Sequence, residues 1–145
     1  MGMTPSVRSL LPAAVALLGC SGVLGPVPDG KQLAIIGPGP TPNDFPGIPD
    51  TVNAGPTTIR YNTYGSSSCN RPAGEGIETE STVRVTFTAY DEEVPSGAVC
   101  TADFVTFNRT VTVTLSPGQV RLVLRGLQFG GGRTPAEIAR TVIVR

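Results

Sequence analysis

Three segments of the chain alternate apolar and polar residues with a strict period of two. They are residues 82–90 (TVRVTFTAY), 109–116 (RTVTVTLS) and 119–126 (QVRLVLRG). This period is typical of β-strands that bury one face, and the abundance of Val and Thr favours strands further. Weaker strand candidates are residues 58–63, 103–107 and 140–145. No long helical period accompanies them, so the domain is expected to be all-β.

Turn-forming residues separate these segments at short intervals, for example residues 72–76 (PAGEG) and 130–132 (GGG). About six strands within residues 57–145 favour a small antiparallel β-sandwich of the immunoglobulin-like kind, with a small β-barrel as the alternative. The inward rows are expected to form the core, and the Thr rows to face solvent. The predicted core residues are Val83, Val85, Phe87, Val111, Val113, Leu115, Val120, Leu122 and Leu124.

Two local features refine this expectation. The turn Ser116-Pro117-Gly118 predicts a tight antiparallel hairpin between the segments on either side of it. Thr134, Pro135 and Glu137 have the spacing of an N-cap, N1 and N3, which matches a single helical turn before the last strand.

Residues 20–56 have a different composition from the domain that follows. Eight of the 14 prolines and seven of the 18 glycines lie between residues 21 and 56. Proline lacks a backbone donor and fixes φ, so this segment is expected to be an extended, disordered tether. The apolar residues 31–36 (KQLAII) are the exception, and they are expected to dock on the domain as an edge strand.

The N-terminus has the layout of an export signal. Arg8 provides a positive charge, and an apolar run over residues 10–18 follows it. That run is much shorter than the roughly 20 residues that a membrane-spanning helix needs. Residues 1–19 are therefore interpreted as a signal peptide, with ordinary cleavage near Gly22 as the alternative that would release a secreted protein.

The end of that segment, Leu17-Leu18-Gly19-Cys20, resembles the lipobox of bacterial lipoproteins. The resemblance implies cleavage before Cys20, a diacylglycerol on the Cys20 thiol and a fatty acyl chain such as palmitate on its amino group. Two or three acyl chains are enough for stable membrane attachment, where one alone is marginal. In Gram-negative members of that family, a Ser such as Ser21 after the cysteine implies sorting to the outer membrane.

Charge argues against nucleic-acid binding. The chain has 11 Lys+Arg and 11 Asp+Glu, and removal of Arg8 with the signal peptide leaves a net charge of −1. Nucleic-acid binding needs a concentrated cationic face. The expected partners are the membrane, through the acyl chains on Cys20, and an envelope protein.

Cys69 and Cys100 are the cysteines that remain after Cys20. An even pair in an exported chain usually forms a disulfide. The competing interpretation, a redox or nucleophilic thiol, lacks both a C-x-x-C spacing and a histidine that would lower the thiol pKa. A stabilising disulfide between Cys69 and Cys100 is predicted.

Little catalytic chemistry is available to this chain. It has no His, which removes the usual nucleophilic schemes, and its only Lys, Lys31, lies in the expected tether. The carboxylates Asp91, Glu92 and Glu93 are interpreted as a solvated turn rather than as a calcium or catalytic site. The other acidic candidates in the domain are Glu75, Glu78, Glu80 and Asp103. No cofactor, metal site or enzymatic activity is predicted.

Two groups of side chains could bind a ligand instead. Arg84, Arg121 and Arg125 lie on polar strand faces, where guanidinium groups recognise phosphate or carboxylate. A sugar platform would have to use the exposed rings of Tyr61, Tyr64, Tyr90 and Phe129. The leading hypothesis is a membrane-anchored envelope lipoprotein with a structural or protein-binding role, and the alternative is a glycan- or anion-binding module.

Overall fold

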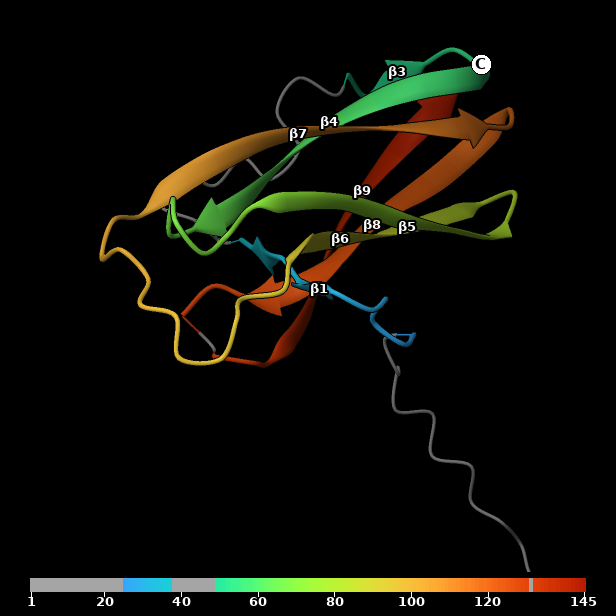
Figure 1. Ribbon diagram of the computed structural model, residues 1–145. Helices are drawn as coiled ribbons and strands as arrows, with labels where there is room; N and C mark the ends of the chain where they lie inside the picture. Colours follow the sequence, from blue (N-terminus) through green and yellow to red (C-terminus); the bar gives the residue numbers. More distant parts are fainter. Residues whose placement is uncertain (1–24, 38–48, 131) are drawn as a thin grey trace, which may run out of the picture.

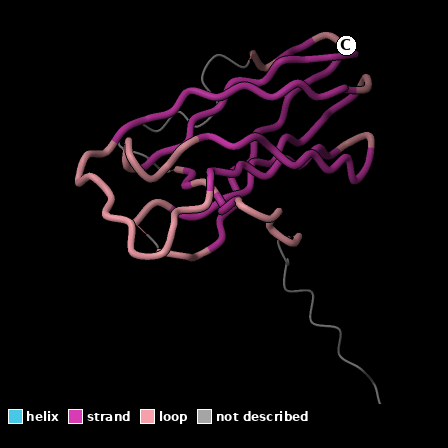
Figure 2. The backbone as a smooth tube through the Cα atoms, in the orientation of Figure 1, coloured by secondary structure: helices cyan, strands magenta, loops and turns pink. Residues whose placement is uncertain are grey.

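The computed structural model describes residues 25–37, 49–130 and 132–145, and these form nine strands and no helix (Figures 1 and 2). The predicted signal peptide and Cys20 lie outside the described residues, as do residues 21–24 and 38–48 of the predicted tether. The all-β prediction is confirmed. The strands are β1 (Lys31–Leu33), β2 (Ile35–Ile36), β3 (Thr51–Val52), β4 (Gly55–Gly65), β5 (Pro72–Ser81), β6 (Arg84–Glu92), β7 (Val105–Leu115), β8 (Gly118–Gln128) and β9 (Pro135–Val144).

The strands belong to one mixed sheet that curls into a half-barrel. The main order is β1-β6-β8-β2-β4-β7, with β5 on β6, β9 on β8 and β3 on β9. β4 and β7 form one layer; the other consists of β5 and β6 below them and of β8 and β9, which slope from the level of β7 down behind them (Figure 1). Three pairs are parallel, namely β2 with β8, β3 with β9 and β6 with β8. The pairing therefore differs from the antiparallel, immunoglobulin-like sandwich that the sequence favoured.

The core lies between the two layers and contains the predicted inward rows. Phe87 of β6 meets Tyr61 of β4 edge to face, with ring centroids 5.4 Å apart. Eight of the nine predicted core residues are buried, whereas Val83, in the turn between β5 and β6, is 59% exposed. Thr110, Thr112 and Thr114 of β7 are exposed as expected, but Thr86 and Thr88 of β6 are buried.

The predicted hairpin between residues 109–116 and 119–125 is wrong. β7 pairs with β4, and β8 pairs with β9, β6 and β2, so the turn at Ser116 and Pro117 carries the chain from one layer to the other. β7 and β8 each bury their apolar row against the opposite layer, whereas a hairpin would place both strands in the same layer.

Two further expectations about local structure are wrong. The PAGEG turn is the start of β5, and Pro135–Glu137 begins β9 rather than a helical turn.

Residues 31–36, which we call the wedge segment, are only partly the edge strand that the sequence predicts: β1 pairs with β6 alone, whereas β2 lies inside the sheet between β8 and β4. β6 and β8 pair directly only along residues 84–88 and 121–125. Beyond this point β1 pairs with β6, while β2 pairs with both β8 and β4. Ala34, between β1 and β2, donates its N–H to Ala89 O (2.9 Å) and accepts the N–H of Leu127 (2.8 Å). The wedge segment thus fills the gap between two diverging strands and links them to the upper layer.

Gly126 of β8 makes room for this arrangement. A Cβ at position 126 would lie 2.5 Å from Ala34 O and 2.8 Å from Ile36 Cγ2. Ala34 and Ile36 are fully buried, so the wedge segment has no free space into which to move. A close backbone approach of this kind is one of the reasons for glycine inside a strand.

We therefore expect Gly126→Ala to reduce the free energy of unfolding by about 1–3 kcal/mol, because the added methyl group overpacks the contact with the wedge segment. Gly25→Ala is the matched control, since its methyl group would meet only Glu78 Oε1, at 3.7 Å. Urea unfolding of both variants measures the difference. Equal stability of the two variants would show that the wedge segment does not press on Gly126.

Candidate functional site

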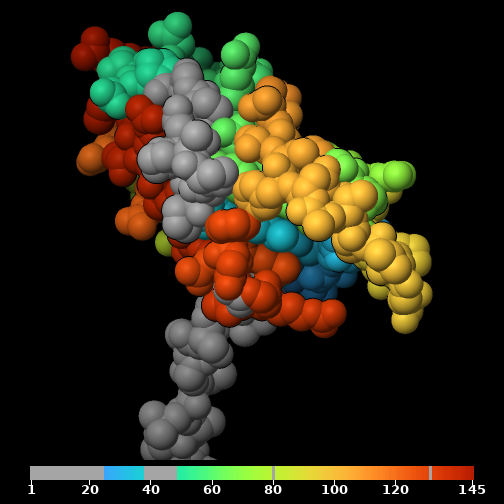
Figure 3. All heavy atoms as spheres, turned by 90° about the vertical axis from the view of Figure 1, so that its left-hand side faces the viewer, coloured from blue at the N-terminus to red at the C-terminus, as the bar shows by residue number. Residues whose placement is uncertain are grey.

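The predicted disulfide cysteines lie at one end of the half-barrel, together with the acidic candidates Asp91 and Asp103. There the β4–β5 turn (residues 66–71) meets the long β6–β7 loop (residues 93–104), which projects from the body of the molecule (Figure 3). The predicted Cys69–Cys100 disulfide is present and joins these two segments, with Cα atoms 5.5 Å apart. We call this end the disulfide corner.

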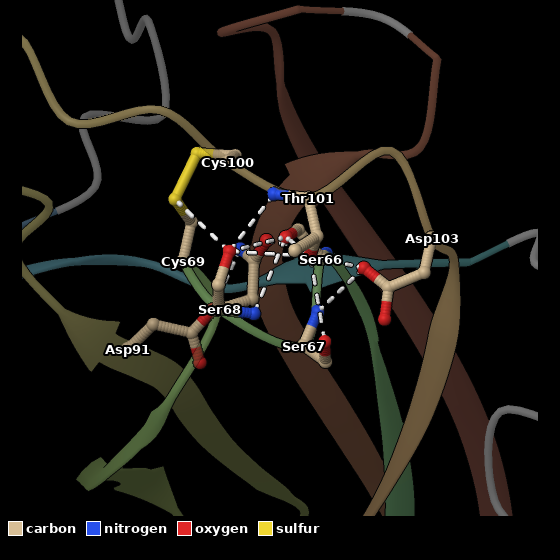
Figure 4. The surroundings of a disulfide bond; sticks show 9 residues. Ser66, Ser67, Ser68, Cys69, Asp91, Cys100, Thr101 and Asp103 are labelled. Carbon is tan, nitrogen blue, oxygen red and sulfur yellow. Dashed lines mark hydrogen bonds between the residues drawn. A yellow bond between two sulfur atoms is a disulfide. The ribbon is translucent and has the colours of Figure 1, made fainter.

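Hydroxyl groups surround the disulfide (Figure 4). Thr101 donates its backbone N–H to Ser68 Oγ (2.9 Å), and its hydroxyl lies 2.8 Å from Ser66 Oγ. Asp103 accepts hydrogen bonds from the backbone N–H of Ser67 (3.2 Å) and from the Thr101 hydroxyl. These bonds, that of Ser67 first, lower the pKa of Asp103 below its ordinary value. The Asp103 carboxylate therefore serves to hold the two loop segments together.

Asn70 connects the disulfide corner to the interior. Its backbone N–H donates to Ser66 O, and its Oδ1 accepts the Ser66 N–H, both at 2.9 Å. Its Nδ2 donates to Asp91 Oδ2 at 3.1 Å. Gly65 has a φ of 147°, and any Cβ there would overlap the Asn70 side chain. The turn is thus fixed by one glycine and one amide.

Asp91 is completely buried and pairs with Arg109 of β7, which is 6% exposed. Arg109 Nη1 donates to Asp91 Oδ1 at 3.2 Å. Burial raises the pKa of Asp91 above its ordinary value, and the Asn70 hydrogen bond and the Arg109 charge oppose that rise. The prediction that residues 91–93 form a solvated turn is wrong for Asp91, whereas Glu92 and Glu93 are exposed as expected.

Arg109 joins the two layers at this end. Its Nη2 donates to Gly74 O and to Tyr90 O, each at 2.8 Å, and lies 3.4 Å from Glu75 Oε1. Its guanidinium carbon sits 5.5 Å from the centre of the Tyr61 ring. These contacts hold β7 against β5 and β6 by one side chain. We call Arg109, Asp91, Glu75 and Tyr61 the buried clasp.

Tyr61 completes the buried clasp. Its hydroxyl donates to Glu75, and burial, followed by that hydrogen bond, raises its pKa far above the ordinary value. Tyr61 therefore stays protonated and acts as a donor. A buried ionic cluster that is this fully hydrogen-bonded is well suited to fixing how two layers align.

The arginines proposed to recognise anions lie on the outer face of β6 and β8, where most are already neutralised. Arg84 and Arg121 are neighbours across the parallel pair. Arg125 bonds Glu137 Oε1 through Nε at 2.6 Å and Glu78 Oε2 through Nη1 at 3.3 Å, and Arg84 lies 3.7 Å from Glu137. Acidic and basic side chains of β5, β6, β8 and β9 therefore alternate across this face, which is not a purely cationic patch.

The tyrosines do not form a sugar platform. Tyr61 and Tyr64 are fully buried and Tyr90 is 8% exposed, so their ring faces are occupied by protein. Phe129, at 39% exposed, contacts Phe104, with ring centroids 4.6 Å apart, and Phe104 in turn stacks on Tyr64.

A cavity of about 370 Å³ lies between β4 and the β3–β9 pair, on the side where the curled sheet does not close. Its lining includes the core residues Ile59, Leu122 and Val142 and the threonines Thr57 and Thr58. Arg60 is the one charged residue among those that line it. Without a carboxylate or thiol in its wall, this cavity offers shape and apolar surface but no acid or base.

Metal and membrane features are absent from the part of the chain that the structure describes. No three His, Cys, Asp or Glu side chains there come close enough to hold a metal ion. None of the described residues forms a helix with the length and apolar character to cross a membrane. Comparison of the chain with protein-family models, curated proteins and solved structures finds no match.

We expect Arg109→Leu to lower the free energy of unfolding by about 3–5 kcal/mol, because it leaves Asp91 buried without its partner charge. The double variant Arg109→Leu/Asp91→Leu should recover much of that loss, since it removes both charges. Urea unfolding of the two single variants and the double variant gives the coupling energy. Additive effects would contradict the buried clasp.

Proposed function

We propose that this chain is an exported lipoprotein that displays a non-enzymatic, protein-binding or structural β-domain at the cell envelope. The observation that carries the proposal is the Cys69–Cys100 disulfide, which lies between two surface segments, with Cys100 exposed. Accessible disulfides persist in oxidising compartments and are rare in the cytosol. The disulfide thus supports export independently of the N-terminal signal that the sequence predicts.

The fold sets how far the domain would stand from its anchor. The sheet starts at Lys31, so only residues 21–30 separate the proposed lipid attachment site, Cys20, from the first strand. Ten residues span about 35 Å when fully extended. The proposed tether is therefore short, and the domain works close to the bilayer surface rather than at the end of a long spacer.

Binding is favoured over catalysis because the carboxylates Asp91, Glu75 and Asp103 are engaged by other protein groups. Asp91 and Glu75 contact Arg109, and Asp103 bonds the loop around the disulfide. A general acid or base has to reach its substrate, which the buried clasp does not allow. The alternative of glycan or anion binding has less support, because the tyrosine rings are covered and Arg84 and Arg125 are paired with glutamates.

The intact mass of the full chain, purified in detergent from membranes of a bacterial host that acylates lipoproteins, tests the proposal. We expect the mass of residues 20–145 plus two or three acyl chains, with Cys69 and Cys100 alkylated only after reduction. Cys20→Ser is the control, and it should retain its signal segment and carry no acyl chain.

An unacylated mature chain that starts elsewhere would contradict the anchor. Cys69 and Cys100 alkylated without reduction would contradict export to an oxidising compartment.

A further inference from the structure

β7 offers a long, regular and unpaired strand edge. It pairs with β4 through 11 consecutive residues without a register shift, from Val105 opposite Gly65 to Leu115 opposite Gly55. β5 approaches part of β7 without pairing with it, and Arg109 bonds Gly74 O through its side chain, so among the described residues no strand pairs with the outer side of β7.

The side chains of β7 do not protect this edge. Proteins usually protect open edges with proline, bulges, charged side chains or a covering segment. β7 contains no proline, and its one charged residue, Arg109, is buried in the clasp. Its outward row is neutral and exposed, consisting of Thr106, Asn108, Thr110, Thr112 and Thr114.

Other lateral strands of the same sheet are protected. β5 starts at Pro72, carries Glu75 and Glu78, and has two register shifts against β6. β9 starts at Pro135, carries Glu137 and Arg140, and is partly covered by β3. Because protection is present on these edges and missing on β7, the open β7 edge is a specific feature rather than a general property of the fold.

We propose that β7 pairs antiparallel with β7 of a second copy of this chain across a two-fold axis at Thr110. Full overlap of the 11 residues then places Thr110 opposite its own copy, Asn108 opposite Thr112 and Thr106 opposite Thr114. On the inner face Phe107 meets Val113, and Val105 meets Leu115. No like charges oppose each other in this register, and Thr–Thr pairs are favourable across strands.

The size of the contact suits a real interface. In an antiparallel ladder every second pair exchanges two backbone hydrogen bonds, so 11 pairs form about 10–12. A typical protein interface has about ten direct hydrogen bonds. The second copy would also join the two half-barrels into one continuous sheet. This inference goes beyond the proposed function and does not depend on the lipid anchor.

A symmetric cysteine cross-link tests the register. In the full chain, Thr110→Cys should form a covalent dimer on mild oxidation, because position 110 faces itself at a Cα distance compatible with a disulfide. Thr106→Cys or Thr114→Cys alone should not cross-link, but co-expression of these two variants should. The cross-link is scored on non-reducing gels in both membrane and soluble fractions, so loss of the anchor does not affect the result.

Two glutamates introduced on β7 test the proposed pairing without introducing cysteines. Thr110→Glu/Thr112→Glu brings four carboxylates together across the proposed axis and should raise the dimer Kd about tenfold or more. Thr79→Glu/Thr141→Glu has the same composition, with both changes at exposed positions of β5 and β9, which do not pair with β7, and should leave the Kd unchanged. Sedimentation equilibrium of the full chain in detergent measures both.

A monomer at all concentrations would overturn the proposal. So would a dimer that forms equally well in both charge variants, or efficient cross-linking through Thr106→Cys alone.

Discussion

The backbone of Ala34 holds the half-barrel together. β6 and β8 run side by side for five residues and then separate, and two strands that diverge in a sheet leave unpaired backbone groups. The wedge segment satisfies these groups on both sides, through Ala34 N to Ala89 and Leu127 N to Ala34 O. It also continues into β2, which among the described strands is the one that pairs with both β8 and β4. Without it, the upper layer would lose its strand pairing with the lower one and keep only side-chain hydrogen bonds to it.

The buried clasp and the disulfide corner add further links between the two layers that the wedge segment connects. Arg109 ties β7 to β5 and β6 through backbone carbonyls and through Asp91. Asn70 then links Asp91 to the turn that carries Cys69. Burying charges is costly, but here each has a partner, so the cluster fixes the relative position of the layers. The surface loops and the interior at this end are therefore one connected unit.

The alternating pattern in the sequence predicted the strands and the core, because period two is a local property of the chain. The same pattern contained the buried clasp. Arg109 continues the inward row of Val111, Val113 and Leu115, and Asp91 continues that of Val85 and Phe87. Extending both rows by two residues would have placed two opposite charges in the core. Charged residues at strand ends are usually solvated, so the alternating pattern alone does not indicate that these two are buried.

Other features depend on contacts between distant parts of the chain. β5 contains proline and two glycines, and its strand conformation comes from pairing with β6 at an edge. The parallel pair of β6 and β8, and the position of the wedge segment between them, join residues far apart in the sequence. Local composition predicted that residues 31–36 dock on the domain, because Leu33–Ile36 are apolar, but it does not show which strands they pair with.

Both the closure of the sheet and the length of the proposed tether depend on the wedge segment being part of the folded sheet. Hydrogen exchange of the native protein, resolved to single amides, tests it most directly. The amides of Ala34 and Leu127 should exchange only through global unfolding, as slowly as the β8 core amide of Leu122. Fast exchange of Ala34, at the rate of the exposed loop at residues 93–104, would show that the wedge segment is not a fixed part of the sheet.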